Sequence, residues 1–271
     1  MSPGFSVHAA LTTPFSQGGA LDLEALRAHV ELLVEDGLDG VVVAGTTGEG
    51  PLLEEAEVEA AVAAAVEASA DRIEVIAHVG RASTLATTRL APAAAAAGAD
   101  ALIAVTPYYF ELGDDQLLRH YETLLGAAGG MPVLAYTFPD RTGNELTPEV
   151  LDRLAGEGLA GLKDSTKSPE RHREYLEVGR RHPDLRVMVG AERLALQSLR
   201  GGGAGSISAL ANVRADVLLG LRDEPSDRAQ DAVDSAREPI PDIPSVKRAV
   251  SERLAARGIP YPSAPRAPLA G

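Results

Sequence analysis

The chain has 271 residues, of which 45% are hydrophobic, and a formal net charge of −14 at pH 7. So acidic a chain is poorly suited to nucleic acid or an anionic membrane, because both need a basic surface. The absence of cysteine excludes disulfides, thiolate metal ligands and a cysteine nucleophile. The N-terminus MSPGFSVHAALTTPF does not resemble a signal peptide, and every long apolar run is interrupted. We therefore expect a cytoplasmic protein with no membrane segment.

Short apolar runs bounded by turn residues recur along the chain, as expected for buried strands. They cover residues 7–11, 41–44, 74–78, 101–105, 133–136, 159–163, 186–190 and 206–208. Helical patterns fill the gaps, and four of them have N-cap residues at Asp22, Ser83, Thr147 and Ser168.

The alternation of strand and helix predicts an α/β fold with a parallel sheet. The number of strands favours a closed (β/α)8 TIM barrel. A doubly wound sheet is the alternative, but no G-x-G-x-x-G follows the first strand.

The pattern weakens after the last predicted strand. We expect the barrel to occupy residues 1–212 and a short C-terminal helical region, residues 213–271, to pack on it as part of a single domain. One short helix is predicted near residues 226–237 and another over 245–258, followed by a proline-rich tail.

In a (β/α)8 barrel, active sites lie at the C-terminal ends of the strands. Those ends carry one lysine, hydroxyls from threonine and tyrosine, one arginine and glycine-rich turns. The segments are AGTTGEG, TPYYF, AYTFPDRTG, GLKDST and GSISALAN.

Lys163 is one of only three lysines, and it directly follows the apolar run 159–162. Desolvation favours the neutral form of a buried lysine, and a neutral amine can attack a ketone to form a Schiff base. Arginine cannot do this, because it stays protonated. The structural alternative is a lysine that extends to solvent or pairs with Asp164.

Other candidates surround this predicted nucleophile. Gly45, Thr46 and Thr47 offer backbone N–H groups and hydroxyls that suit a carboxylate or phosphate. Tyr136 could shuttle a proton, and Arg141 could bind a carboxylate with two hydrogen bonds. Taken singly, these residues are also consistent with a plain glycine turn, a core tyrosine and a surface ion pair.

The six histidines show neither H-x-H nor H-x-x-x-H spacing, so we predict no histidine-based metal site. His78 ends a predicted strand, and a structural role is the simpler interpretation. No pattern indicates a carboxylate metal site or an organic cofactor.

Together these motifs resemble the dihydrodipicolinate synthase / N-acetylneuraminate lyase family of pyruvate-dependent class I aldolases. The resemblance depends on G-T-T-G-E at 45–49, T-P-Y-Y at 106–109, Y-x-x-P-x-R-T-G at 136–143 and G-x-K-D at 161–164. The segment IPSVKRAV is also similar to the family's C-terminal helix. The resemblance implies a (β/α)8 barrel that condenses pyruvate with an aldehyde, without metal or organic cofactor.

Carried over to this sequence, the resemblance assigns the imine with pyruvate to Lys163 and proton transfer to Tyr136. It assigns the pyruvate carboxylate to Thr46 and Thr47, with Gly45 in the same loop, and places the backbone carbonyl of Ile207 near the imine.

The resemblance also implies that Tyr109 completes a hydroxyl relay in a neighbouring subunit's site. We therefore expect a homo-oligomer, a dimer or tetramer. Arg141 stands where synthases of the family bind the carboxylate of aspartate semialdehyde. This favours 4-hydroxy-tetrahydrodipicolinate synthase, an enzyme of lysine biosynthesis.

Several positions depart from the synthase pattern, namely His78, Thr137, Phe138 and Ala191–Glu192. A 2-keto-3-deoxy sugar-acid aldolase of the same family is therefore the alternative. A non-catalytic barrel that binds a 2-oxo acid is the alternative from another class. A phosphate-binding isomerase using the glycine-rich segment 201–206 is disfavoured, because that segment precedes the last strand.

Overall fold

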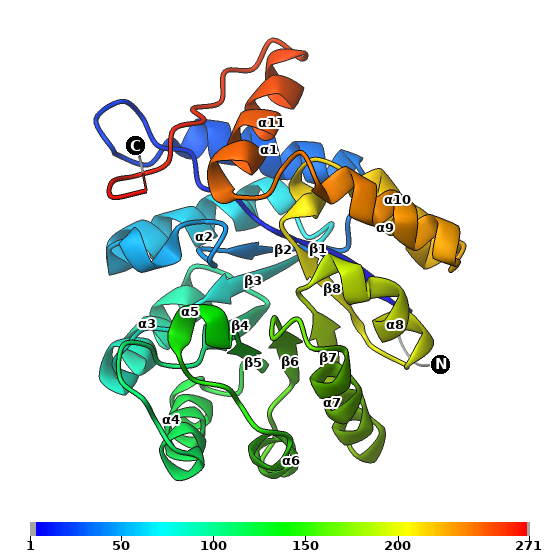
Figure 1. The fold of residues 1–271 in the computed structure, drawn as a ribbon. Helices are drawn as coiled ribbons and strands as arrows, with labels where there is room; N and C mark the ends of the chain where they lie inside the picture. The colour runs from blue at the N-terminus through cyan, green and yellow to red at the C-terminus, as the bar shows by residue number, and fades with distance from the viewer. Residues whose placement is uncertain (1–3, 270–271) are drawn as a thin grey trace.

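The computed structural model describes residues 4–269, and in them parallel strands close into a barrel in sequence order (Figure 1). The predicted (β/α)8 barrel is confirmed. The strands are β1 (Ser6–Ala10), β2 (Gly40–Val43), β3 (Glu74–His78), β4 (Ala101–Val105), β5 (Val133–Thr137), β6 (Gly161–Asp164), β7 (Arg186–Val189) and β8 (Gly205–Ser208).

Helices surround the strands and cover the outside of the barrel (Figure 1). They are α1 (Leu23–Glu35), α2 (Glu55–Ser69), α3 (Thr84–Ala96), α4 (Asp114–Ala127), α5 (Pro139–Thr142), α6 (Pro148–Gly156), α7 (Pro169–Arg181) and α8 (Ala195–Arg200). Short 3-10 turns are η1 (Gly50–Leu52), η2 (Glu192–Leu194) and η3 (Leu210–Asn212). The C-terminal extension comprises α9 (Ala215–Asp223), α10 (Asp227–Arg237) and α11 (Ile243–Ala255).

The sequence marks the start of several helices correctly. The side chains of Asp22, Ser83, Thr147 and Ser168 each accept a hydrogen bond from a backbone N–H in the first turn that follows. Such caps satisfy donors that have no partner within the helix. The predicted N-caps are therefore confirmed.

The barrel interior is polar at both ends and apolar between them. Inward-facing Ile76, Leu134 and Met188 form part of the apolar middle. At the N-terminal ends of the strands, His8 Nε2 lies 2.8 Å from Glu74, which also pairs with Arg186 at 2.9 Å. This network occupies one end of the barrel, and the other end carries the candidate site.

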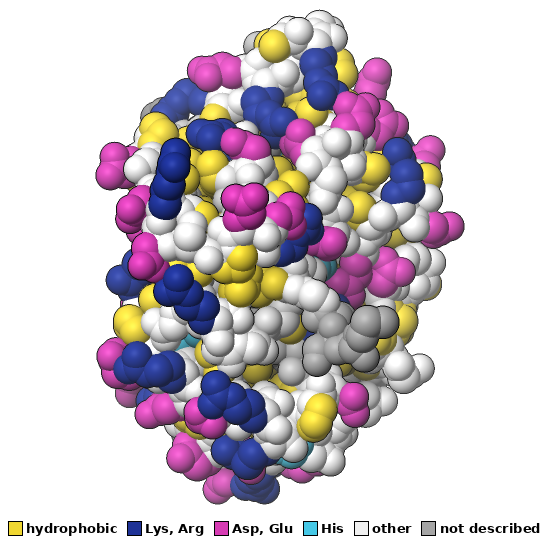
Figure 2. All heavy atoms as spheres, turned by 90° about the vertical axis from the view of Figure 1, so that its right-hand side faces the viewer, with side chains coloured by type: hydrophobic (Ala, Val, Ile, Leu, Met, Phe, Trp, Pro, Cys, Tyr) yellow, Lys and Arg dark blue, Asp and Glu magenta, His cyan; other side chains and the backbone are white. Residues whose placement is uncertain are grey.

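On the face beside α8 and α10, acidic and basic side chains are interspersed (Figure 2). Charges of opposite sign are also paired along α7, where Arg173 pairs with Glu170 and Arg180 with Glu177. Interspersed charges of both signs prevent a strong single-sign field on this face.

Candidate active site

A cavity of about 630 Å³ opens at the C-terminal ends of the strands. The barrel strands, the loops that follow them and helix α10 all contribute to its walls. The lining residues are Ala10, Thr46, Thr47, Tyr136, Phe138, Lys163, Ser165, Lys167, Gly190, Ala191, Glu192, Arg193, Ile207, Ala209, Asp234, Arg237, Glu238 and Pro241. Four predicted groups, the two threonines, Tyr136 and Lys163, therefore meet at one place.

Strand register brings Lys163 and Tyr136 together. The two residues are partners across the β5–β6 pair, so their side chains leave the same face of the sheet, toward the barrel interior. Lys163 Nζ lies 4.3 Å from the centroid of the Tyr136 ring, and Lys163 is only 6% exposed. The amine therefore lies in the wall of the cavity, against the face of the Tyr136 ring.

The alternative interpretations of Lys163 find no support in this geometry. Asp164 is the next residue on β6 and therefore points to the opposite face. Its carboxylate lies 2.8 Å from His172 Nδ1 and accepts a hydrogen bond from the Thr166 N–H at 2.7 Å. Lys163 is buried, and its neighbour Asp164 is paired with other groups.

The loop after β2 places two hydroxyls beside this pair. Thr46 Oγ1 lies 3.3 Å from the Tyr136 hydroxyl, a long hydrogen bond that links the loop to β5. The loop begins and ends with left-handed residues, Ala44 at φ 57° and Glu49 at φ 58°. A Cβ on Gly50 would stand 1.7 Å from the Ala44 carbonyl oxygen, so only glycine allows this tight closure.

Gly45 and Ile207 hold different positions around the cavity. Gly45 is buried within the loop, and Ile207 lines the cavity on β8 with 1% exposure.

Gly190, which follows β7, was missed by the sequence analysis. A Cβ there would meet Ser165 Oγ at 2.2 Å and Lys163 Cε at 3.1 Å. A glycine at this position therefore leaves room for the lysine side chain.

The outer part of the cavity is charged. Ser208 Oγ donates a hydrogen bond of 2.7 Å to Glu192 Oε1, and Arg237 Nε lies 3.6 Å from Glu192 Oε2. Arg237 comes from α10, outside the barrel, so the rule that barrel sites lie at strand ends could not find it. Its only sequence signal was the short predicted helix near residues 226–237.

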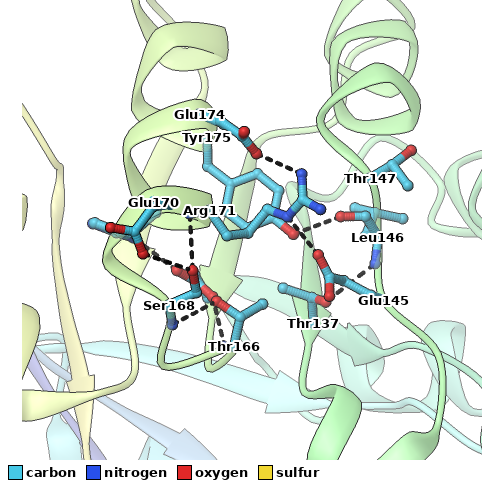
Figure 3. Close-up of polar contacts among 12 residues, drawn as sticks. Thr137, Glu145, Leu146, Thr147, Thr166, Ser168, Glu170, Arg171, Glu174 and Tyr175 are labelled. Atoms are coloured by element: carbon cyan, nitrogen blue, oxygen red, sulfur yellow. Dashed lines mark hydrogen bonds and ion pairs between the residues drawn. The ribbon is translucent and has the colours of Figure 1, made fainter.

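Arg141 is placed differently from Arg237. It lies on the short helix α5, is exposed and lies outside the group of described residues that line the cavity. The segment between α5 and α6 is anchored to β5 and α7 (Figure 3). The Leu146 N–H donates a hydrogen bond of 3.1 Å to Thr137 Oγ1 on β5, and the Leu146 carbonyl accepts one of 2.5 Å from the Tyr175 hydroxyl on α7. Arg171, also on α7, pairs with Glu145 at 2.5 Å.

Tyr109 also lies away from the cavity of its own chain. It is 87% exposed, adopts a left-handed φ of 83° and packs against Phe110, which is 69% exposed. Large aromatic side chains are seldom left so open on a monomer surface.

His78 lies under the site and is uncharged at neutral pH. Burial, together with the charges of Arg81 and Lys163, lowers the pKa of His78 to about 3. Its Nε2 accepts a hydrogen bond from the Val105 N–H at 3.2 Å. This contact agrees with the structural role predicted for His78.

A larger cavity of about 880 Å³ lies between α9, α10 and α11. Its described lining has arginines but neither lysine, tyrosine nor threonine. The predicted imine mechanism needs an amine nucleophile, and the described lining of the larger cavity has no lysine. The smaller cavity around Lys163 is therefore the candidate active site.

The family model of the dihydrodipicolinate synthetase family matches residues 5–270. The chain belongs to this family. Its members are lyases of the class I aldolase type that act on pyruvate, and the chain is therefore a lyase of that type.

Relatives within the family carry different names. A Streptomyces coelicolor protein named 4-hydroxy-tetrahydrodipicolinate synthase 1 is 36% identical over 254 residues, 93% of this chain and 79% of that protein. An Escherichia coli N-acetylneuraminate lyase is 33% identical over 208 residues, 76% of this chain and 69% of that protein. A solved prophage protein of the family from E. coli K12, in complex with pyruvate, has a TM-score of 0.88 at 26% identity and covers 97% of this chain and 92% of its own.

Within residues 4–269, no helix has the length and apolar character needed to cross a membrane, and no group of three or more His, Asp or Glu side chains is placed to hold a metal ion.

Proposed function

We propose that the protein condenses pyruvate with aspartate semialdehyde, the reaction of 4-hydroxy-tetrahydrodipicolinate synthase. The observation that carries the proposal is the buried Lys163 amine against Tyr136, with the Thr46 hydroxyl 3.3 Å from the Tyr136 hydroxyl. A binding protein needs no nucleophile, whereas an imine mechanism needs this set of groups. Relatives that bear the synthase name support the choice of aldehyde.

In the proposed reaction the Lys163 amine attacks the ketone carbon of pyruvate, and water leaves to give a protonated imine. Loss of a proton from the pyruvate methyl group gives an enamine. The enamine carbon then attacks the aldehyde carbon, and the aldehyde oxygen takes up a proton. The amino group of the bound aspartate semialdehyde portion then attacks the imine carbon and displaces the Lys163 amine, which closes the ring of the product and restores the enzyme.

The neighbouring groups have matching roles in this scheme. Tyr136 transfers protons to and from the forming imine, and Thr46 connects it to the loop after β2. Thr47 and the backbone of Gly45 are proposed to bind the pyruvate carboxylate. The Ile207 carbonyl is proposed to face the imine from β8.

The second candidate is an aldolase for 2-keto-3-deoxy sugar acids. One observation favours it. The Glu192 carboxylate lines the cavity, and a carboxylate can accept hydrogen bonds from the hydroxyl groups of a sugar-derived aldehyde.

Borohydride trapping tests the proposed function. The protein is mixed with pyruvate, reduced, and analysed by intact mass and peptide mapping beside Lys163→Ala. We expect a pyruvyl adduct on Lys163 that is lost in the variant. A folded wild-type protein that gives no adduct would contradict the proposal. Aspartate semialdehyde and glyceraldehyde, each added with pyruvate, then distinguish the two candidates by the condensation product formed.

A further inference from the structure

The turn that carries Thr46 and Thr47 is closed by Glu49. The Glu49 N–H donates a hydrogen bond of 3.1 Å to the Thr46 carbonyl. Glu49 adopts a left-handed φ of 58°, a conformation that is uncommon for a residue other than glycine. Such a backbone conformation persists only where the surrounding structure fixes it. The contacts of Glu49 therefore bear directly on the position of the two threonines.

The Glu49 side chain is held by the C-terminal extension. It is buried and lies outside the group of described residues that line the cavity. One carboxylate oxygen accepts a hydrogen bond of 2.7 Å from Lys247 Nζ on α11, and the other accepts one of 2.7 Å from the Arg266 N–H in the tail. Since both oxygens are engaged away from the cavity, Glu49 can influence a substrate only through the turn.

The Arg266 side chain fixes the tail at this place. The tail turns back from α11 toward the start of α2 (Figure 1), where the two terminal nitrogens of the guanidinium pair with Glu57 at 2.6 and 2.7 Å. Nη1 also donates a hydrogen bond of 2.9 Å to the Leu52 carbonyl, and Nη2 donates to the Gly19 carbonyl. The guanidinium carbon lies 4.4 Å from the centroid of the Phe15 ring. A two-point pair of this kind defines the orientation of the side chain as well as its position.

Arg266 thus contacts three points of the segment that leaves the turn. They are the Glu49 carboxylate, the Leu52 carbonyl and the Glu57 carboxylate. Within the turn itself, the Thr13 hydroxyl adds one hydrogen bond of 2.7 Å, to the Gly48 carbonyl. Loss of the Arg266 side chain would release the tail from α2, and the N–H that faces Glu49 would be released with it.

We propose that Arg266 is a positioning residue for the candidate active site. It holds the tail against α2, its N–H fixes Glu49, and Glu49 holds the turn in the shape that binds pyruvate. The inference rests on the proposed function, which assigns the pyruvate carboxylate to this turn. The C-terminal tail therefore contributes to substrate binding without touching the substrate.

Borohydride trapping with pyruvate tests the inference, because it gives two separate readings. The pyruvate concentration that gives half-maximal adduct reports binding by the turn, and the amount of adduct at saturation reports a competent Lys163. In Arg266→Ala we expect the half-maximal concentration to rise about tenfold, because hydrogen bonds to the pyruvate carboxylate are weakened. The adduct at saturation should be unchanged.

Arg266→Lys keeps the charge without the planar fork, and it should show a smaller rise of about threefold. This variant also decides the question if Arg266→Ala does not fold. A partial recovery by lysine is expected only if the anchoring of the tail to Glu57 matters for pyruvate binding.

Arg253→Ala is the matched control. Arg253 also ties the C-terminal extension to the barrel, since its Nη2 lies 2.8 and 2.9 Å from the two oxygens of Asp36 at the end of α1. Both pairs are partly buried, but Arg253 contacts no residue of the turn. Urea denaturation should show a lower unfolding midpoint for both alanine variants. Only Arg266→Ala should raise the half-maximal pyruvate concentration.

The outcomes separate the two proposals. If wild-type protein forms no pyruvate adduct, the proposed function fails and the inference fails with it. If wild-type protein is trapped but the folded Arg266 variants reach half-maximal adduct at the wild-type concentration, the inference alone is overturned, and Arg266 serves stability only. An equal rise in Arg253→Ala would also overturn it, because any loosening of the C-terminal extension would then have the same effect.

Discussion

The Lys247 ammonium lies 2.7 Å from the Glu49 carboxylate, and both side chains are fully buried. Lys247 also donates to the Ala264 carbonyl at 2.8 Å, and the second Glu49 oxygen accepts from the Arg266 N–H at 2.7 Å. Burial lowers the pKa of Lys247, while Glu49 favours its charged form. One ion pair thus joins the C-terminal helix α11 and the tail to the loop that carries Thr46.

Lys247→Met should strongly destabilise the protein, because it leaves the Glu49 charge buried without its partner. We expect a loss of about 3–5 kcal/mol in the free energy of unfolding. Urea denaturation measures it. Lys167→Met is the control, since its pair with Asp140 is exposed and should contribute less than about 1 kcal/mol. Equal losses in the two variants would contradict a special role for the buried pair.

Tyr136→Phe should slow turnover while pyruvate still forms an adduct on Lys163. The ring that faces the lysine is kept, but the hydroxyl next to Thr46 is lost, and general acid–base groups typically contribute about 100- to 10,000-fold. Steady-state kinetics gives kcat, and trapping gives the adduct. Tyr121→Phe is the control, since that buried hydroxyl donates to the Ala104 carbonyl behind the strands. A Tyr136→Phe variant with wild-type kcat would exclude proton transfer by this hydroxyl.

Tyr109→Asp should reduce the size of the assembly. Tyr109 and Phe110 form an exposed aromatic pair, and we expect this pair to pack against a second copy of the chain. Light scattering after size-exclusion chromatography should give a dimer or tetramer for the wild type and a smaller species for the variant. Leu269→Asp changes another exposed apolar side chain and is the control. A monomeric wild-type protein would contradict the expected oligomer.

The sequence predicted the fold and the centre of the site because both depend on local patterns. Apolar runs identified every strand within one or two residues of its observed bounds, and the strand ends placed Lys163 and Tyr136 at the same mouth of the barrel. The register that makes the two residues partners is seen only in the structure. The hydroxyls of Thr46 and Thr47 followed from the rule that barrel sites lie at strand ends.

The outer site could not be predicted in the same way. Arg237 reaches the cavity through the packing of α10 against the loop after β7, a contact between residues far apart in the chain. The pairing of Glu49 with Lys247 is likewise a long-range contact, although the segments GTTGE and IPSVKRAV were each recognised separately. Periodicity and caps define elements, but they do not define which side chains of distant elements meet.

The stability of the protein should fall as the pH drops from 7.5 to 5.5. Burial lowers the pKa of both His29 and His78 to about 3 and that of His120 to about 4, from an ordinary value of 6.5. The unfolded chain therefore binds more protons than the folded protein between these values, and protonation favours unfolding as the pH falls. At pH 5.5 each histidine should cost roughly 1–2 kcal/mol relative to pH 7.5.

Urea denaturation at the two pH values measures this effect, because most carboxylates stay ionised at pH 5.5. His78→Gln keeps a side-chain acceptor for the Val105 N–H but cannot be protonated in this range. The variant should therefore lose about a third of the pH-dependent change that the three histidines produce. His182→Gln is the control, since His182 is partly exposed and lies on the surface beside Asp152. A pH dependence that is the same in His78→Gln as in the wild type would show that His78 is not buried in its neutral form.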